Sequence, residues 1–111
     1  MGLARQNRVA EAVRAAVANY LILNLANLTP GFISVSKVKM APDLKLATVY
    51  FSIFGSEEDK AFSFKTLEKH KGRIRYHVGQ EVLLKYVPEL RFFIDDTLEY
   101  ADKINKVIKK L

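Results

Sequence analysis

The chain has 111 residues, of which 50% are hydrophobic, and it contains no cysteine. This length and apolar content predict one folded domain over residues 1–111, and the lack of thiols excludes disulfides and thiolate metal sites. The formal net charge of +6 favours an anionic partner such as nucleic acid or an acidic membrane surface. We find no signal-peptide pattern and no apolar run of membrane-spanning length, so we expect a cytoplasmic protein.

The first predicted element is an amphipathic helix, because apolar side chains recur at helical spacing near the N-terminus. This apolar series consists of Val9, Val13, Val17, Tyr20, Leu21 and Leu28. Thr29-Pro30-Gly31 then ends the helix, since proline and glycine both interrupt helical geometry.

A β-hairpin follows, with predicted strands over residues 32–40 and 44–54. Apolar and polar residues alternate along both strands, as expected for a sheet with one buried face. If Met40 lies opposite Leu44, the alternation changes phase at the same level in both strands, near Ser36 and near Thr48. We therefore expect a bulge or a strong twist at that level of the hairpin.

A second helix follows the hairpin. Ser56 and Asp59 have the spacing of a capping box, in which each residue bonds the backbone N–H of the other. The helix is expected to end near His70. Its predicted buried stripe consists of Phe62, Phe64 and Leu67.

A third helix is predicted after Gly72, which we expect to kink the two consecutive helices. Its buried stripe consists of Ile74, Val78 and Val82. Pro88 ends this stretch because proline cannot continue a helix. Gly79 lies inside the helix, where we expect it to permit close packing against another element rather than to bind RNA.

The last predicted elements are a third strand over residues 90–94 and a final helix that Asp96 or Thr97 caps. The apolar stripe of the final helix consists of Tyr100, Ile104, Val107, Ile108 and Leu111. The resulting order is α-β-β-α-α-β-α. It predicts an α+β fold, with a three-stranded sheet, helices packed on one face and a kinked helix pair at Gly72.

The basic run around Gly72 is the strongest functional signal in the chain. Its members are Lys65, Lys69, His70, Lys71, Arg73 and Arg75. Backbone N–H groups at the start of a helix attract phosphate, and neighbouring cations strengthen this attraction, so we predict an RNA-binding site here. Secondary candidates are Arg5, Arg8, Arg14, Lys37, Lys39 and Lys45. The alternative interpretation of such a run is a solvated helical face.

The order of elements resembles a type II KH domain, and several local sequences resemble the ribosome-binding factor A family. The resemblance rests on these segments, in this order: Arg8-Val9-Ala10, Met40-Ala41-Pro42-Asp43-Leu44, Ala47-Thr48-Val49-Tyr50-Phe51-Ser52, Gly72-Arg73-Ile74-Arg75, Val78-Gly79, and Val87-Pro88-Glu89-Leu90 with Phe92, Asp95 and Thr97. Together they cover nearly the whole chain.

The resemblance implies a non-enzymatic assembly factor without a cofactor, which binds ribosomal RNA and free, immature small ribosomal subunits as a monomer. It further implies support for maturation of the 5′ end of that RNA and a role in cold growth. Members of the family typically have a small residue, any residue and glycine at an interrupted helix. Here the corresponding segment is His70-Lys71-Gly72, in which histidine replaces the small residue.

Two other classes of function remain open from the residues alone. His70, His77 and Glu81 would share a face of an uninterrupted helix, as in a metal site or an acid–base pair. A protein–protein or membrane-surface module could instead use the amphipathic first or last helix. Adjacent Asp95 and Asp96 are more simply explained as helix caps than as a catalytic carboxylate pair.

Overall fold

The computed structural model describes residues 2–95. Its elements are α1 (Gly2–Tyr20), the π-helical turn η1 (Leu21–Leu25), β1 (Phe32–Met40), β2 (Leu46–Phe54), α2 (Glu57–Lys69), α3 (Lys71–Glu81) and β3 (Glu89–Ile94). This order confirms the predicted α+β fold up to the third strand. The predicted final helix lies outside the described residues. The helices between residues 2 and 95 include none with the length and hydrophobicity of a membrane span.

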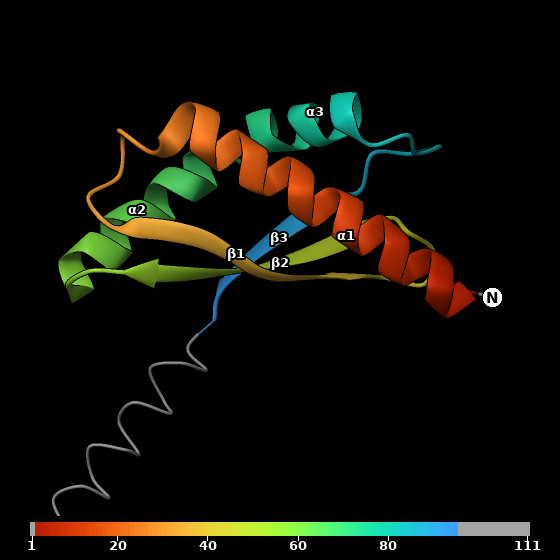
Figure 1. Ribbon diagram of the computed structural model, residues 1–111, viewed down its shortest axis with the longest axis horizontal. Helices are drawn as coiled ribbons and strands as arrows, with labels where there is room; N and C mark the ends of the chain where they lie inside the picture. The colour runs from red at the N-terminus through yellow and green to blue at the C-terminus, as the bar shows by residue number, and fades with distance from the viewer. Residues whose placement is uncertain (1, 96–111) are drawn as a thin grey trace, which may run out of the picture.

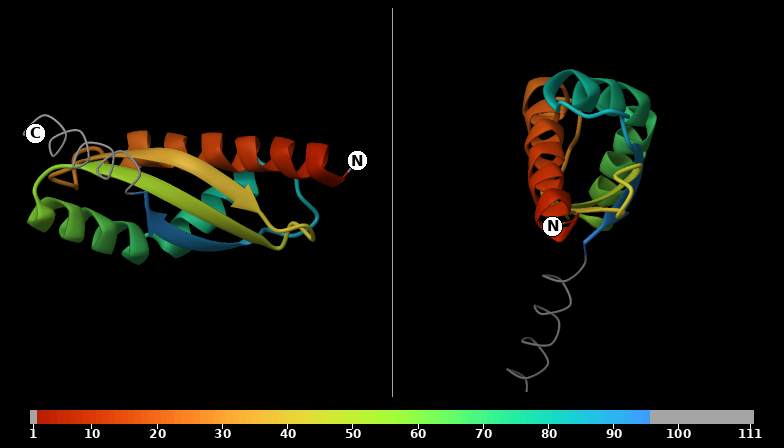
Figure 2. Two further views of the ribbon diagram at one scale, coloured as in Figure 1. Left: turned by 90° about the horizontal axis from the view of Figure 1, so that it is seen from below. Right: turned by 90° about the vertical axis from the view of Figure 1, so that its right-hand side faces the viewer.

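The sheet has the strand order β1-β2-β3, with β1 antiparallel and β3 parallel to β2. Helices α1, α2 and α3 all lie on one side of it (Figure 1). Seen from below, the strands lie in front of the helices (Figure 2, left). The described part of the chain therefore leaves the other face of the sheet without a covering helix.

The core lies between the helices and the sheet. Helix α1 contributes Val13 and Val17 to the core, and β2 contributes Val49 and Phe51; all four side chains are fully buried. The ring of Phe51 meets the ring of Phe92 edge to face, at 5.0 Å between centroids. Of the apolar series predicted for the first helix, Val13, Val17, Tyr20 and Leu21 are buried and Val9 is partly buried. Leu28 is exposed and lies beyond the helix, and Leu25, which was not predicted, is buried in its place.

The hairpin contains the predicted bulge in one strand only. In β1 the register shifts between Val35 and Lys37, so that Ser36 is the extra residue. This shift lets Val35 and Met40 face the core although an odd number of positions separates them. The expected irregularity near Thr48 is wrong, because β2 alternates buried and partly exposed residues without interruption.

The predicted register of the hairpin is also wrong. Met40 pairs with Ala47 rather than with Leu44, because the loop is longer than the predicted turn. Asp43 Oδ1 accepts the N–H of Lys45, and Leu44 has a left-handed backbone with φ of 61°. The N–H of Ala41 donates to the carbonyl of Leu46, and the N–H of Leu44 donates to the carbonyl of Ala41, so backbone bonds close the loop together with this side-chain bond.

The capping box of α2 is confirmed. Ser56 Oγ accepts the N–H of Asp59 at 3.1 Å, and Asp59 Oδ2 accepts the N–H of Ser56 at 3.3 Å. In the buried stripe, Leu67 is buried as predicted and Phe64 packs against the core, but Phe62 is 56% exposed and Ser63 is buried instead. Residues 63 and 67 are one helical turn apart, and residue 62 points away from their common face.

The bend between the two central helices lies at His70 rather than at Gly72. Helix α2 ends at Lys69 and α3 begins at Lys71, so one residue, with φ of −91° and ψ of 1°, redirects the chain. The His70 N–H still bonds the carbonyl of Thr66, and its carbonyl accepts the N–H of Ile74. Hydrogen bonding on both sides of a single non-helical residue is sufficient for the bend, so glycine is not required for it.

Candidate nucleic-acid interface

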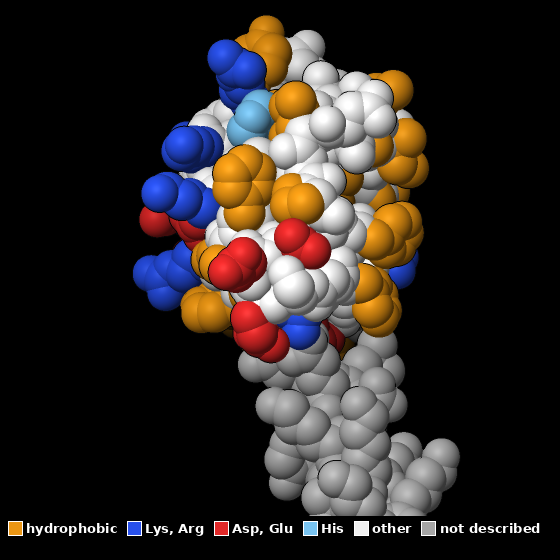
Figure 3. All heavy atoms as spheres, turned by 90° about the vertical axis from the view of Figure 1, so that its left-hand side faces the viewer, with side chains coloured by type: hydrophobic (Ala, Val, Ile, Leu, Met, Phe, Trp, Pro, Cys, Tyr) orange, Lys and Arg blue, Asp and Glu red, His pale blue; other side chains and the backbone are white. Residues whose placement is uncertain are grey.

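The outer face of the α2–α3 bend carries three exposed cations. We call Lys65, Lys69 and Arg73 the outer cations. They follow one another at intervals of four residues, which keeps side chains on one helical face and extends that face across the bend. In Figure 3, Lys and Arg side chains form a line along one edge of the molecule, and acidic side chains gather at its lower end.

The outer cations have no ion pair or hydrogen bond within residues 2–95. The acidic residue in the bend, Glu68, instead pairs with Lys71 at 2.8 Å. Three uncompensated positive charges on an exposed surface attract a polyanion, and this attraction weakens with salt. The outer cations are therefore neither buried nor paired with a carboxylate among residues 2–95.

Lys71 and Arg75 belong to the same basic run but contact the protein itself. Lys71 Nζ pairs with Glu68 and lies 4.9 Å from the centroid of the Phe92 ring. Arg75 donates from Nε to the carbonyl of Pro88 and from Nη2 to the carbonyl of Val87, each at 3.0 Å. We call the two hydrogen bonds of Arg75 together the Arg75 contact, and they fix the chain just before β3 begins.

His70 turns toward α1. Its Nδ1 lies 2.8 Å from the hydroxyl of Tyr20, and the two rings meet edge to face. His77, on α3, also meets the Tyr20 ring edge to face, with 5.7 Å between the centroids. His70 at the bend and His77 in α3 thus pack against the same tyrosine ring.

The structure does not bring His70, His77 and Glu81 together as a set of metal ligands. His77 Nε2 lies 4.0 Å from a carboxylate oxygen of Glu81, while His70 is bonded to Tyr20. Within residues 2–95 there is no group of three or more histidines, cysteines or acidic residues able to hold a metal.

Gly72 and Gly79 have different surroundings. A Cβ added to Gly72 would meet no atom within 4 Å, so this position is open to solvent and to a ligand. A Cβ added to Gly79 would lie 2.9 Å from Val87 Cγ2. The expectation that Gly79 permits close packing is therefore confirmed.

The secondary candidates lie on other surfaces. Arg5, Arg8 and Arg14 are exposed on α1, and among residues 2–95 only Arg14 of these three forms an ion pair, at 3.9 Å from Glu11. Lys37 and Lys39 lie over the Tyr50 ring, and Lys45 lies over the Tyr86 ring. The structure thus separates the predicted cations into the bend, the first helix, and the sheet with the loop before β2, rather than joining them.

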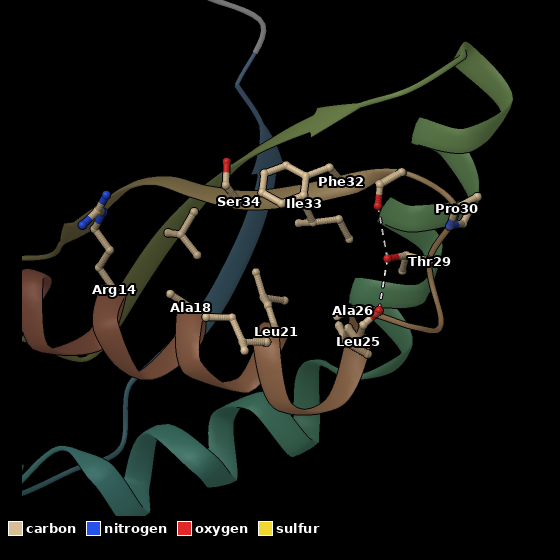
Figure 4. Close-up of a pocket in the computed structure, with 13 residues that line it drawn as sticks. Arg14, Ala18, Leu21, Leu25, Ala26, Thr29, Pro30, Phe32, Ile33 and Ser34 are labelled. Carbon is tan, nitrogen blue, oxygen red and sulfur yellow. Dashed lines mark hydrogen bonds between the residues drawn. The ribbon is translucent and has the colours of Figure 1, made fainter.

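An apolar pocket of about 510 Å³ lies between the end of α1 and the edge strand β1 (Figure 4). Leu21, Leu25 and Ile33 point into it, and Arg14 lies at one end. Thr29 closes the other end by donating a hydrogen bond to the carbonyl of Leu25 at 3.1 Å. With one cation in its lining, the pocket lacks the charge that phosphate binding needs. Sequence reasoning did not predict it.

Comparison with known proteins identifies the family. The family model described as ribosome-binding factor A matches residues 5–108. Ribosome-binding factor A of Citrifermentans bemidjiense is 38% identical over 107 residues, which are 96% of this chain and 90% of that protein. The crystal structure of ribosome-binding factor A from Thermus thermophilus aligns with a TM-score of 0.67 and 20% identity, over 80% of this chain and 94% of that one.

A second structure extends the comparison of the fold. A homology model of Thermus thermophilus ribosome-binding factor A, fitted into the cryo-EM map of a 30S complex, aligns with a TM-score of 0.63. It is 19% identical and covers 76% of this chain and 88% of its own. The family model and the relative at 38% identity both span nearly the full chain, as the sequence resemblance implied. This chain belongs to the ribosome-binding factor A family.

Proposed function

We propose that this protein binds the small ribosomal subunit during assembly, through phosphates of its RNA, at the outer face of the α2–α3 bend. The observation that carries this proposal is the group of three outer cations, which are exposed and without an intramolecular partner among residues 2–95. Membership in the family supports the choice of partner. So does the relative whose coordinates are fitted into a 30S complex.

Recognition at the bend depends on shape and charge. Ammonium and guanidinium groups on one helical face contact successive phosphates, and such contacts set position without reading sequence. Specificity then comes from the folded shape of the ribosomal RNA. The open space around Gly72 lets the RNA backbone approach the first turn of α3, where no side chain caps the helix.

The remaining residues of the basic run have a supporting role in this proposal. Lys71 and Arg75 add positive charge near the bend while they hold the fold, and His70 orients the two helices through Tyr20. Arg5, Arg8, Arg14, Lys37, Lys39 and Lys45 are candidates for separate RNA contacts. We propose that the protein acts as a monomer in the cytoplasm, without catalysis, and that it favours maturation of the 5′ end of the RNA by holding an immature arrangement.

Co-sedimentation with purified small subunits at increasing salt tests the proposal. If the three outer cations each neutralise one phosphate, they contribute about −2 to −3 to the slope of log affinity against log salt, between the single-strand and duplex coefficients. Large subunits serve as the control for non-specific adsorption. An affinity that does not change with salt, or equal binding to both subunits, would contradict the proposal.

A further inference from the structure

The face of the sheet opposite the helices carries a row of side chains that the bend does not use. Lys37 pairs with Tyr50 across β1 and β2, and Tyr50 pairs with Phe93 across β2 and β3. Paired residues in a sheet point to the same face, so the three side chains stand side by side. Within residues 2–95 the helices all cover the other face (Figure 1).

The row is stacked. The rings of Tyr50 and Phe93 are 5.8 Å apart between centroids, with 28° between their planes. Lys37 Nζ lies 4.7 Å from the centroid of the Tyr50 ring, and Lys39 Nζ lies at 5.9 Å. Phe93 is 48% exposed, and within residues 2–95 β3 is an edge strand, so no further strand of that part of the chain covers the outer side of its ring.

An exposed aromatic ring next to ammonium groups is the arrangement that binds single-stranded nucleic acid. A base stacks on the ring whatever its identity, because every base has a π face, and the cations hold the phosphates. Arg91 adds a third cation to this face from β3. The neighbouring carboxylate of Asp95 accepts a hydrogen bond from Ser36, the bulged residue of β1.

The bulge in β1 is what aligns the row. Without the bulge, Ser36 would pair with Tyr50, and Lys37 and Lys39 would keep the phase of Val35 and point into the core. With it, Lys37 and Lys39 lie on the open face beside Tyr50. The irregularity thus places both positive charges next to the aromatic pair.

We propose that this row is a second RNA contact, on which one unpaired base stacks against Phe93 while Lys37 and Lys39 hold flanking phosphates. The inference deepens the proposed function and rests on it for the identity of the natural RNA. It assigns single-stranded RNA to the open sheet face and leaves phosphate contacts of folded RNA to the bend.

Tryptophan fluorescence tests the stacking directly. The chain contains no tryptophan, so Phe93→Trp introduces a single reporter at the proposed contact. Titrating the full-length variant with a single-stranded oligouridylate should quench its emission, and an RNA duplex of the same length should quench it far less. Emission that is already blue-shifted in the free protein and insensitive to RNA would show that residues 96–111 or a second copy cover this face. That result, or no response with exposed emission, overturns the proposal.

A matched pair of alanine variants separates this site from the bend. Phe93→Ala should weaken small-subunit binding about 5- to 150-fold, the range for loss of one stacked base. Phe32→Ala removes a more exposed ring, 69% accessible, from the same sheet face, where no lysine of the described residues lies over it, and should leave affinity within about twofold. Circular dichroism confirms that both variants fold.

The outcomes distinguish the two proposals. If the wild-type protein binds small subunits and Phe93→Ala binds equally well, the stacking site is wrong and the bend proposal stands. If the wild-type protein does not bind small subunits but the oligonucleotide quenches Phe93→Trp, the sheet site stands and the proposed partner is wrong.

Discussion

The outer cations and the Arg75 contact show that basic side chains only a few residues apart have different roles, one a proposed role in binding and the other a role in holding the fold. Lys69 and Arg73 extend into solvent without a partner among residues 2–95, whereas Arg75 donates to two backbone carbonyls. Arg73 and Arg75 are less than one helical turn apart in sequence. Proximity within a basic run is therefore a poor guide to which residue meets RNA.

The same division applies to the two glycines of α3. Gly72 lies in open space at the start of the helix, and Gly79 lies against Val87, next to the Arg75 contact. One region of the helix is thus available to a ligand, and the other holds the connection that leads into β3. Substitutions in the first region should change binding, and substitutions in the second should change stability.

Charge reversal at the outer face should have the largest effect. The double variant Lys69→Glu with Arg73→Glu should bind small subunits at least about 100-fold more weakly, at about 1.4 kcal/mol for each charge-assisted contact. Its unfolding midpoint in urea should not change, because neither side chain has an intramolecular partner among residues 2–95. Binding is measured by co-sedimentation at fixed salt.

Lys85→Glu is the matched control for that variant. Lys85 is also exposed, but it lies over the Tyr86 ring in the connection before β3. The same change of charge there should weaken binding only slightly, through long-range repulsion. Equal losses for both variants would mean that net charge, and not the outer face, determines affinity.

Removing the Arg75 contact should mainly destabilise the fold. Arg75→Gln loses the bonds to Val87 and Pro88, which should lower the free energy of unfolding by about 1–2 kcal/mol after solvent screening of an exposed side chain. Urea denaturation measures the loss, with Arg73→Gln as the control at about 0.5 kcal/mol or less. If Arg75→Gln and Arg73→Gln were equally stable, this would contradict the structural role assigned to Arg75.

Gly79→Ala should lower the free energy of unfolding by less than Arg75→Gln does. The added methyl group would contact Val87 Cγ2 at 2.9 Å, and overpacking of about 1–3 kcal/mol is partly offset by about 1 kcal/mol of better helix propensity. We expect a net loss of about 1 kcal/mol in unfolding free energy, relieved when Val87→Ala is added. A more stable Gly79→Ala protein would contradict the close packing.

Gly72→Ala should have the smallest effect and the opposite sign. Alanine meets nothing within 4 Å there and favours a helix, so unfolding free energy should rise by about 0.5 kcal/mol. A loss above about 1 kcal/mol would show that the bend needs glycine after all, at the cost expected for a strained backbone position.

Local rules predicted much of the fold. The capping box at Ser56 and Asp59 and the role of Gly79 depend on neighbours in sequence, and both are confirmed. The bulge at Ser36 was visible as a change of apolar phase, because a one-residue slip moves every later side chain to the other face. The family resemblance was also predicted and is confirmed.

Predictions that needed distant contacts fared worse. The hairpin register depends on which strand positions pair across the loop, and the burial of Ser63 rather than Phe62 depends on which face of α2 packs against the sheet. At the bend, the ring of His70 contacts the hydroxyl of Tyr20, fifty residues earlier in the chain. The hydrogen-bond partners of Arg75 are the carbonyls of Val87 and Pro88 in the connection before β3, and no spacing of residues in the sequence predicts such bonds. Which basic residues bind RNA, and whether residues 1–111 form one domain, stay predictions.

The salt dependence of small-subunit binding tests the central claim most directly. The triple variant Lys65→Gln, Lys69→Gln and Arg73→Gln should fold like the wild type and lose about 2 to 3 from the magnitude of the slope of log affinity against log salt, since each phosphate contact contributes about 0.7 to 0.9. The paired variant Lys71→Gln and Arg75→Gln should retain most of the slope. An unchanged slope in the triple variant, or its loss in the paired variant alone, would contradict the assignment of RNA binding to the outer cations.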